Sequence, residues 1–280
     1  MLQKIQILID NRLSAASPAL LKEHGLSIYF EVNQKGYLFD AGASGKFARN
    51  ALELGVDLNN TEILFLSHGH NDHTGGLRRF LELNTTASVV VSKEVPESKC
   101  YTCRKEEKRA IGVDCRLFRN EDPRFIYLSE SVMITPEIGV VFNKYKTHPV
   151  PLSNNTLSYE KEGKEQPDTF RHELALALKT NRGLVILSAC SHNGVLNIIE
   201  SCCEFMNTKK VDMFVGGTHL VEGDFETELQ VRDFAIQLDR LYPDMELFTG
   251  HCTSDAAFNQ LRSILGKRAV QFFSGFTLTF

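Results

Sequence analysis

The stretch FLSHGHNDHTGG, residues 65–76, governs the interpretation of the whole chain, because it places three of the nine histidines and an aspartate within six residues. It follows an apolar run of strand length at 61–66. It precedes residues 77–83, whose apolar side chains recur at helical spacing. The cluster is therefore predicted to lie on a loop that leads from a strand into a helix.

The alternation of side chains along an extended backbone predicts which members of this cluster act together. His68 and His70 should project to the same side and can face one metal ion. Asp72 and His73 fall where the backbone turns into the helix, so we expect them to point towards a second ion nearby. Imidazole suits zinc, iron and manganese, and an added carboxylate favours borderline or hard ions over a thiolate-type site. The alternative is a set of solvated loop histidines, and the density of ligands argues against it.

The composition is that of an ordinary soluble globular protein, with 280 residues, 42% hydrophobic and 24% charged residues and a net charge of −4. A chain of this length can bury a substantial core. No basic excess points to a nucleic-acid partner. The N-terminus lacks the apolar region of a signal peptide, and no stretch approaches the ~18 apolar residues of a membrane span. We therefore predict a cytoplasmic protein that uses neither a membrane nor a nucleic acid; its oligomeric state stays open.

Strand and helix patterns alternate along the chain in two similar series. Strands are expected at 1–10, 26–32, 36–40, 61–66, 87–92, 132–135, 139–142, 172–178, 183–188, 211–215, 246–249, 270–273 and 276–280, and helices at 45–54, 77–83, 194–205, 225–241 and 256–265. This order implies two sheets packed face to face with helices outside. We predict a single domain over residues 1–280, with charged, irregular insertions near 93–130 and 144–168 that form loops or a cap over the site.

Further candidate site residues follow predicted strands, the usual place for a ligand site in layered folds. Asp40, His192, His219 and His251 all lie within a few residues of a strand end. His192 and His251 are expected to be metal ligands, because a set of three histidines around one ion is a recurrent metal site. His219 stays open between substrate contact or proton transfer and a structural imidazole. We expect structural roles for His24, His148 and His172.

The motif His68-x-His70-x-Asp72-His73 resembles that of the metallo-β-lactamase superfamily. This resemblance implies a four-layer αββα sandwich of the α/β class and a metal-dependent hydrolase. The cofactors would be two divalent ions, with zinc expected first and manganese, iron or magnesium as alternatives. The implied ligands are His68, His70 and His192 for one ion, and Asp72, His73 and His251 for the other.

Two residues near this site need separate treatment. Many members of the superfamily bridge the two ions with an aspartate after a late strand, but the matching strand here runs into Ala189-Cys190-Ser191. Cys190 is therefore either a substitute ligand or a buried neighbour. We call the loop between the strand at 61–66 and the helix at 77–83 the metal loop. The resemblance also places Asp40 beside this loop, where it would support the ligands or orient a metal-bound water.

The strings Cys190-Ser191-His192-Asn193-Gly194, Gly217-Thr218-His219-Leu220 and Thr249-Gly250-His251-Cys252-Thr253 resemble one branch, the 7,8-dihydropterin-6-methyl-4-(β-D-ribofuranosyl)aminobenzene-5′-phosphate synthases. We predict an enzyme that hydrolyses or transfers an ester, amide or phosphate-type bond of a small molecule, with Asp72 and His219 as catalytic residues. The branch implies instead a condensation of a dihydropterin alcohol phosphate with a ribosylated aminobenzene phosphate. Alternatives on the same fold are an iron-dependent oxygenase or redox protein, and a non-catalytic metal-binding sensor.

The seven cysteines are an odd number and give no disulfide framework. Cys100 and Cys103, with Cys115 further on, could form a zinc knuckle or a redox pair. Only three cysteines lie in this charged segment, so we favour an incidental arrangement. Cys202 and Cys203 fall in a helical pattern and are expected to pack in the core.

Overall fold

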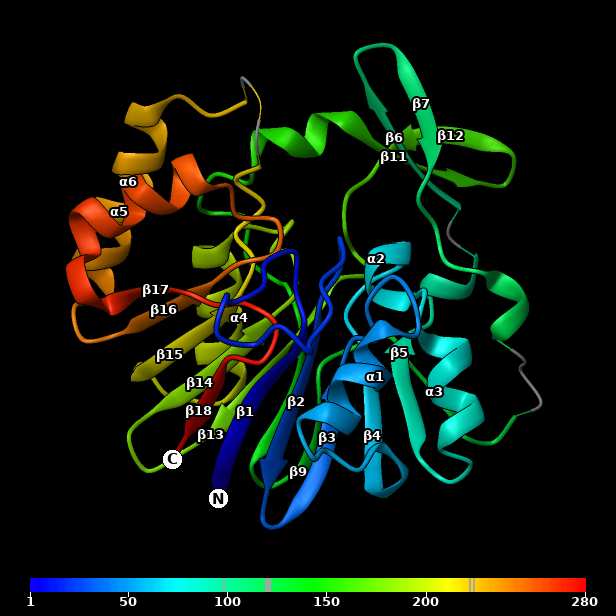
Figure 1. Ribbon diagram of the computed structural model, residues 1–280. Coiled ribbons are helices and arrows are strands. Elements are labelled where there is room, and N and C mark those ends of the chain that lie inside the picture. Colours follow the sequence, from blue (N-terminus) through cyan, green and yellow to red (C-terminus); the bar gives the residue numbers. More distant parts are fainter. Residues whose placement is uncertain (98, 119–121, 222, 224) are drawn as a thin grey trace. The chain divides into compact units, whose positions relative to one another are not determined.

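The computed structural model describes residues 1–97, 99–118, 122–221, 223 and 225–280 (Figure 1). The chain forms two compact units. The first comprises Met1–Ser129, Thr156–His172 and Phe273–Phe280, and the second comprises Glu130–Asn155 and Glu173–Phe272. Within the part of the chain that is described, no helix is long and apolar enough to cross a membrane.

The first unit contains a seven-stranded sheet whose parallel strands bring two candidate loops to one edge. Its strand order is β18-β1-β2-β3-β4-β5-β8, and β3, β4, β5 and β8 run parallel. Because parallel strands end at the same edge, Asp40 after β3 and the metal loop after β4 are neighbours. The bounds are β1 Leu2–Ile9, β2 Ser27–Val32, β3 Lys35–Phe39, β4 Thr61–Leu66, β5 Ser88–Ser92, β8 Phe125–Leu128 and β18 Thr277–Thr279.

Helices cover one face of this sheet. The bounds are α1 Lys46–Glu53, α2 Asn71–Thr74 and α3 Leu77–Leu83, with short 3-10 turns at Leu58–Asn60, Val95–Glu97 and Cys115–Leu117. Phe47 of α1 and Phe80 of α3 are fully buried against strand residues such as Leu64. Each such burial contributes about 1.5–3 kcal/mol. Phe65, the next residue of β4, stacks instead with Phe30, as the alternation of a strand requires.

The second unit repeats this plan with its own seven-stranded sheet. The order is β17-β16-β15-β14-β13-β10-β9, and β14 to β17 run parallel. The bounds are β9 Val132–Thr135, β10 Ile138–Phe142, β13 Leu174–Lys179, β14 Leu184–Ser188, β15 Val211–Gly216, β16 Glu246–Thr249 and β17 Ala269–Gln271. Consequently His192, His219 and His251, which follow β14, β15 and β16, share one edge of this sheet.

The helices of the second unit pack on its sheet through a continuous apolar cluster. The bounds are α4 Val195–Phe205, α5 Glu228–Leu241 and α6 Asp255–Leu265, with 3-10 turns at Leu152–Thr156 and Gly266–Arg268. Ile199, Leu238 and Leu261, one from each helix, are buried against strand residues such as Ile186. Helix α5 begins with a capping box in which Thr227 and Gln230 satisfy each other's backbone amides.

The two charged segments are not irregular, which corrects the expectation from the sequence. They form a four-stranded sheet in the first unit, in the order β12-β11-β6-β7, which we call the inserted sheet. The bounds are β6 Lys99–Arg104 and β7 Glu107–Ala110 from the first segment, and β11 Leu157–Lys161 and β12 Lys164–Pro167 from the second. Exposed ion pairs such as Lys99–Glu160, at 2.7 Å, connect β6 to β11. Residues 98 and 119–121 of the first segment lie outside the described residues.

The chain that leaves the inserted sheet is hydrogen-bonded to the metal loop. The Asn71 amide donates to the Ile111 carbonyl at 2.7 Å, and the Val113 amide donates to the Gly69 carbonyl at 2.9 Å. Between them His70 and Gly112 form an isolated antiparallel bridge. The backbone of the metal loop is therefore held by the inserted segment as well as by its own sheet. That the segments cap the site, and that residues 1–280 act as one domain, remain predictions.

Candidate metal centre

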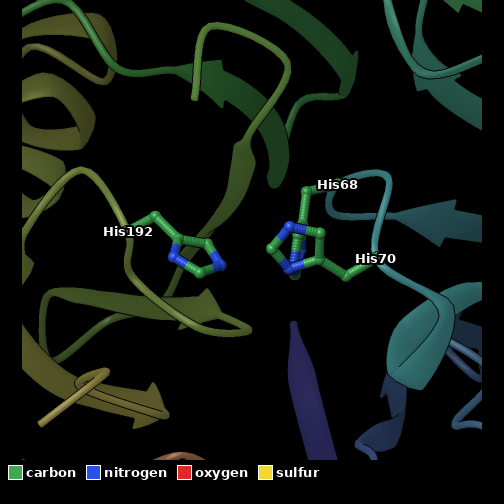
Figure 2. A group of neighbouring side chains, drawn as sticks. All are labelled: His68, His70 and His192. Carbon is green, nitrogen blue, oxygen red and sulfur yellow. The ribbon is translucent and has the colours of Figure 1, made fainter. Parts of the chain in front are cut away.

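The three histidines of the metal loop lie together at the end of β4. The ring of His70 is 4.5 Å from that of His68, and the ring of His73, from α2, is 4.3 Å from it. All three side chains are buried. Figure 2 shows His68 and His70 side by side on this loop. The expected pairing of His68 with His70 is thus present, and His73 lies equally close to His68.

Asp40 fixes the orientation of two of these imidazoles. Its buried carboxylate accepts hydrogen bonds from the Ser67 amide at 2.7 Å, the Ser67 hydroxyl at 2.6 Å and Nδ1 of His73 at 2.7 Å. Because the Ser67 hydroxyl gives its proton to Asp40, it must accept from Nδ1 of His68, at 2.8 Å. Both histidines therefore carry their proton on Nδ1 and offer Nε2 as the donor atom, the arrangement that carboxylate partners impose on metal-binding histidines.

His192, in the second unit, is oriented in the same way by Asn154. The Asn154 side-chain amide donates to the His192 carbonyl at 2.7 Å, which turns its oxygen towards Nδ1 of His192, at 3.0 Å. An amide oxygen can only accept, so Nδ1 carries the proton and Nε2 is left as the donor atom. The buried Glu173 carboxylate accepts the His192 amide at 2.8 Å and holds the backbone of the loop. Figure 2 shows His192 on this loop after β14.

His219 belongs to the same neighbourhood as His192. The two rings are 4.1 Å apart. The Ser153 hydroxyl donates to the His219 carbonyl and accepts from its Nδ1, both at 2.8 Å. His219 thus presents Nε2 beside His192, a geometry that suits contact with a substrate or ligand.

His251 lies beside two thiols of its own unit. Its Nε2 lies 3.4 Å from Sγ of Cys190, and the next residue, Cys252, directs its thiol to the Cys190 carbonyl at 3.6 Å. All three residues are buried. The Cys190 that replaces the expected bridging aspartate is therefore at the side of a candidate ligand.

Several of these loops turn through left-handed backbone conformations that non-glycine residues rarely adopt. The φ angles of Asp40, Ser191, His219 and His251 are 61°, 60°, 53° and 49°. Each conformation costs about 1 kcal/mol or more and persists only where the surroundings impose it. Such residues cluster at binding and catalytic sites, and here each follows the carboxyl end of a parallel strand.

The charges around the metal loop favour neutral imidazoles at His68 and His70 and a protonated imidazole at His73. Burial, reinforced by the charges of His73 and His70, holds the pKa of His68 well below its usual range. Burial likewise lowers the pKa of His70 to about 4, although Asp72 acts in the opposite direction. Burial alone would lower the pKa of His73, but the carboxylates of Asp72 and Asp40 outweigh it and raise the pKa to about 10. The two carboxylates thus provide a charge that a cation can balance.

A second group of side chains contacts the metal loop from the inserted sheet. The donor atoms of His70, Cys100 and Asp168 lie within 4.8 Å of one another. Asp168 pairs with His172 at 3.1 Å, and the His172 ring is 6.3 Å from that of His68. His172, expected to be structural, therefore lies beside the loop. Cys103 and Cys115 are exposed, and no metal-capable group among the described residues joins them to Cys100.

The donor chemistry fits the divalent ions that the sequence predicts. The metal loop offers three imidazoles, and Asp72 adds a carboxylate whose Oδ2 lies 3.5 Å from Nε2 of His73. Imidazole combined with carboxylate suits zinc, iron and manganese. These side chains could hold such an ion while the hydrogen bonds on Nδ1 of His68 and His73 stay as they are.

Ser67, Asn154 and Glu173 are site residues that the sequence interpretation missed. Ser67 directly precedes the histidine motif, and a hydroxyl at this position was the available signal. Asn154 and Glu173 act on His192 from positions 38 and 19 residues away. Such distant partners leave no local pattern.

Comparison with known proteins identifies the class. Residues 22–99 match the Metallo-beta-lactamase superfamily. A crystal structure of a metal-dependent hydrolase of the β-lactamase superfamily is 26% identical, with a TM-score of 0.82 over 99% of both chains. The predicted resemblance to the metallo-β-lactamase superfamily and the predicted fold class are confirmed.

Within this class the chain resembles the branch that its sequence indicated. It is 25% identical over 269 residues to the 7,8-dihydropterin-6-methyl-4-(β-D-ribofuranosyl)-aminobenzene-5′-phosphate synthase of Methanocaldococcus jannaschii, covering 91% of this chain and 89% of that protein. An uncharacterized protein of the same organism is 26% identical over 264 residues, covering 93% and 94%.

Proposed function

We propose that the chain is a dinuclear metal-dependent hydrolase or transferase that acts on a small, phosphate-bearing or pterin-like molecule. The observation that supports it best is the set of fixed Nε2 donors on the metal loop, held through Ser67 and Asp40. The superfamily motif assigns six ligands to two ions: His68, His70 and His192, and Asp72, His73 and His251.

The residues around these donors have distinct roles in this proposal. Divalent ions bound there would supply Lewis acidity and a coordinated water with a pKa of about 7. Asp40 and Asn154 position imidazoles, and Asp72 would both bind an ion and orient the nucleophile. His219, whose Nδ1 is held by Ser153, would use Nε2 to contact the substrate or to donate a proton to the leaving group.

A cavity of about 260 Å³ in the second unit is our candidate for the organic part of the substrate. It reaches Val195, near His192, and Thr218 and Leu220, which flank His219. Its wall is largely apolar, and among the described lining residues there is no lysine or arginine. A phosphate group would therefore be held outside this cavity.

Two carboxylates in the cavity favour a ring with N–H donors. Glu226 and Asp233 both line it. Glu226 is half-buried, its Oε1 accepts the Leu152 amide, and burial raises the pKa of its carboxyl. The aminopyrimidinone edge of a pterin presents adjacent N–H donors, which a carboxylate accepts. The resemblance to a dihydropterin synthase supports the same substrate class.

Turnover and metal content of alanine variants test the proposed ligands. His70→Ala and His192→Ala should each abolish turnover of a generic phosphodiester or ester and lower bound metal, with an unchanged circular dichroism spectrum. His148→Ala is the matched control for metal content, because His148 pairs with Glu200 away from the ligands. Retained turnover in either ligand variant would remove the mechanism.

Binding of a pterin alcohol, followed by its fluorescence, tests the substrate class. Glu226→Gln and Asp233→Asn should each weaken binding about tenfold, since a hydrogen bond to a charged group contributes about 1.5–3 kcal/mol and these sites are partly hydrated. Glu228→Gln removes a charge from α5 outside the cavity and should leave binding unchanged. Equal affinities for all three variants would exclude the cavity as the pterin site.

A further inference from the structure

The residues that follow β14 and β16 meet although β15 lies between these strands. Cys190 comes from the first loop, and His251 and Cys252 from the second. The two sulfurs and one nitrogen of His251 lie within 4.8 Å of one another, all three side chains being buried. Two thiols and an imidazole from distant positions therefore point to a common place within one unit.

The glycine pair at the end of β15 permits this meeting. A Cβ on Gly217 would lie 2.3 Å from Sγ of Cys252 and 2.8 Å from the Ala189 carbonyl oxygen. A Cβ on Gly216 would lie 1.5 Å from the Ser188 carbonyl oxygen. Side chains at either position would push the loops apart, so the absence of Cβ atoms is what lets Cys252 approach Cys190.

The spacing of the donor atoms matches that of ligands on one ion. A tetrahedral zinc ion, with nitrogen at ~2.0–2.1 Å and sulfur at ~2.3 Å, holds these two atoms about 3.5 Å apart. Sγ of Cys190 and Nε2 of His251 are 3.4 Å apart. The separation is thus the one that coordination requires.

We propose that Cys190 and Cys252 are thiolate ligands of the ion that His251 binds, and that they replace the carboxylate bridge found in many superfamily members. On binding, each thiol loses its proton to solvent and the sulfur bonds to the ion. Thiolates select zinc or ferrous iron over manganese and magnesium. This inference rests on the proposed assignment of His251 as a ligand. It limits the metal expected at that site to zinc or ferrous iron.

Cobalt substitution provides a readout that is independent of activity. Co²⁺ bound to thiolate has an intense charge-transfer absorption in the near ultraviolet, which nitrogen and oxygen ligands do not produce. Under reducing conditions, Co²⁺ added to the metal-free protein should produce this band. Cys190→Ser and Cys252→Ser should each lose the part of the band that its own thiolate contributes, and the double variant should lose the whole band. Thermal unfolding of both variants shows whether the fold is retained.

Cys100→Ser is the matched control, because Cys100 is the thiol beside His70 and Asp168. The band should survive in this variant. Loss of the band in Cys100→Ser alone would overturn the proposal, and a band of unchanged intensity in either serine variant would remove that cysteine from the ligands. Bound Co²⁺ with turnover but no band would refute the thiolate ligands while the proposed hydrolase stands. No bound Co²⁺ at all would contradict both.

Discussion

Replacing Asp40 with asparagine should weaken both the fold and the metal site. The carboxylate accepts three hydrogen bonds, two from Ser67 and one from His73, at 2.6–2.7 Å. The asparagine side chain would keep an oxygen for two of these donors and turn an amide group towards the third. Loss of one charge-assisted bond, with a buried donor left unsatisfied, should cost about 2–4 kcal/mol in the free energy of unfolding. For a chain of this size the melting temperature should fall by about 5–15 °C.

The same variant should bind metal about 10–100-fold more weakly, because His73 would lose the partner that sets its orientation. Urea unfolding of the metal-free protein and competition with a zinc chelator measure the two effects. Asp57→Asn is the control, since Asp57 also accepts several hydrogen bonds but caps an exposed turn where asparagine is equally suitable. If Asp40→Asn and Asp57→Asn unfold at the same urea concentration and bind zinc equally, the role assigned to Asp40 is refuted.

Two further variants test the second unit. Asn154→Ala should lower zinc affinity about 10–100-fold in a chelator competition, because Nδ1 of His192 loses its hydrogen bond. The stability of the fold should change little. Unchanged zinc affinity would contradict the orientation proposed for His192. Gly217→Ala should lower the free energy of unfolding, measured in urea, by about 1–3 kcal/mol, because its methyl group would overlap Cys252. Gly45→Ala is the control and should destabilise less, because its methyl group would meet only the flexible Arg79 side chain. Equal destabilisation of the two glycine variants would show that the approach of Cys252 is not restricted at Gly217.

The regular elements were largely predictable because their apolar residues follow the period of the structure they form. The continuous run at 61–66 is β4, and the helical spacing at 77–83 is α3. The inserted sheet was not predictable. Its strands β6 and β11 are held by cross-strand bonds between residues about sixty positions apart, and by exposed pairs such as Lys99–Glu160. A strand with charged residues on an open face has no alternating apolar pattern.

The candidate ligands could be found from the sequence, but the groups that orient them could not. The motif around His68 is local, and its spacing alone indicates metal binding. Ser67 and Asp40 act through a chain of hydrogen bonds that needs the parallel pairing of β3 with β4. His172 was expected to be structural because it begins an apolar strand. Its position beside His68 follows from the pairing of the inserted segments, which no local pattern encodes.

The metal content of protein purified without chelator, determined element by element, tests the central claim most directly. The account predicts about two equivalents of a divalent metal per chain, with zinc foremost, and the loss of metal when His70 and His251 are both replaced by alanine. About one equivalent or less after incubation with zinc, or a metal content that survives the double replacement, would contradict it.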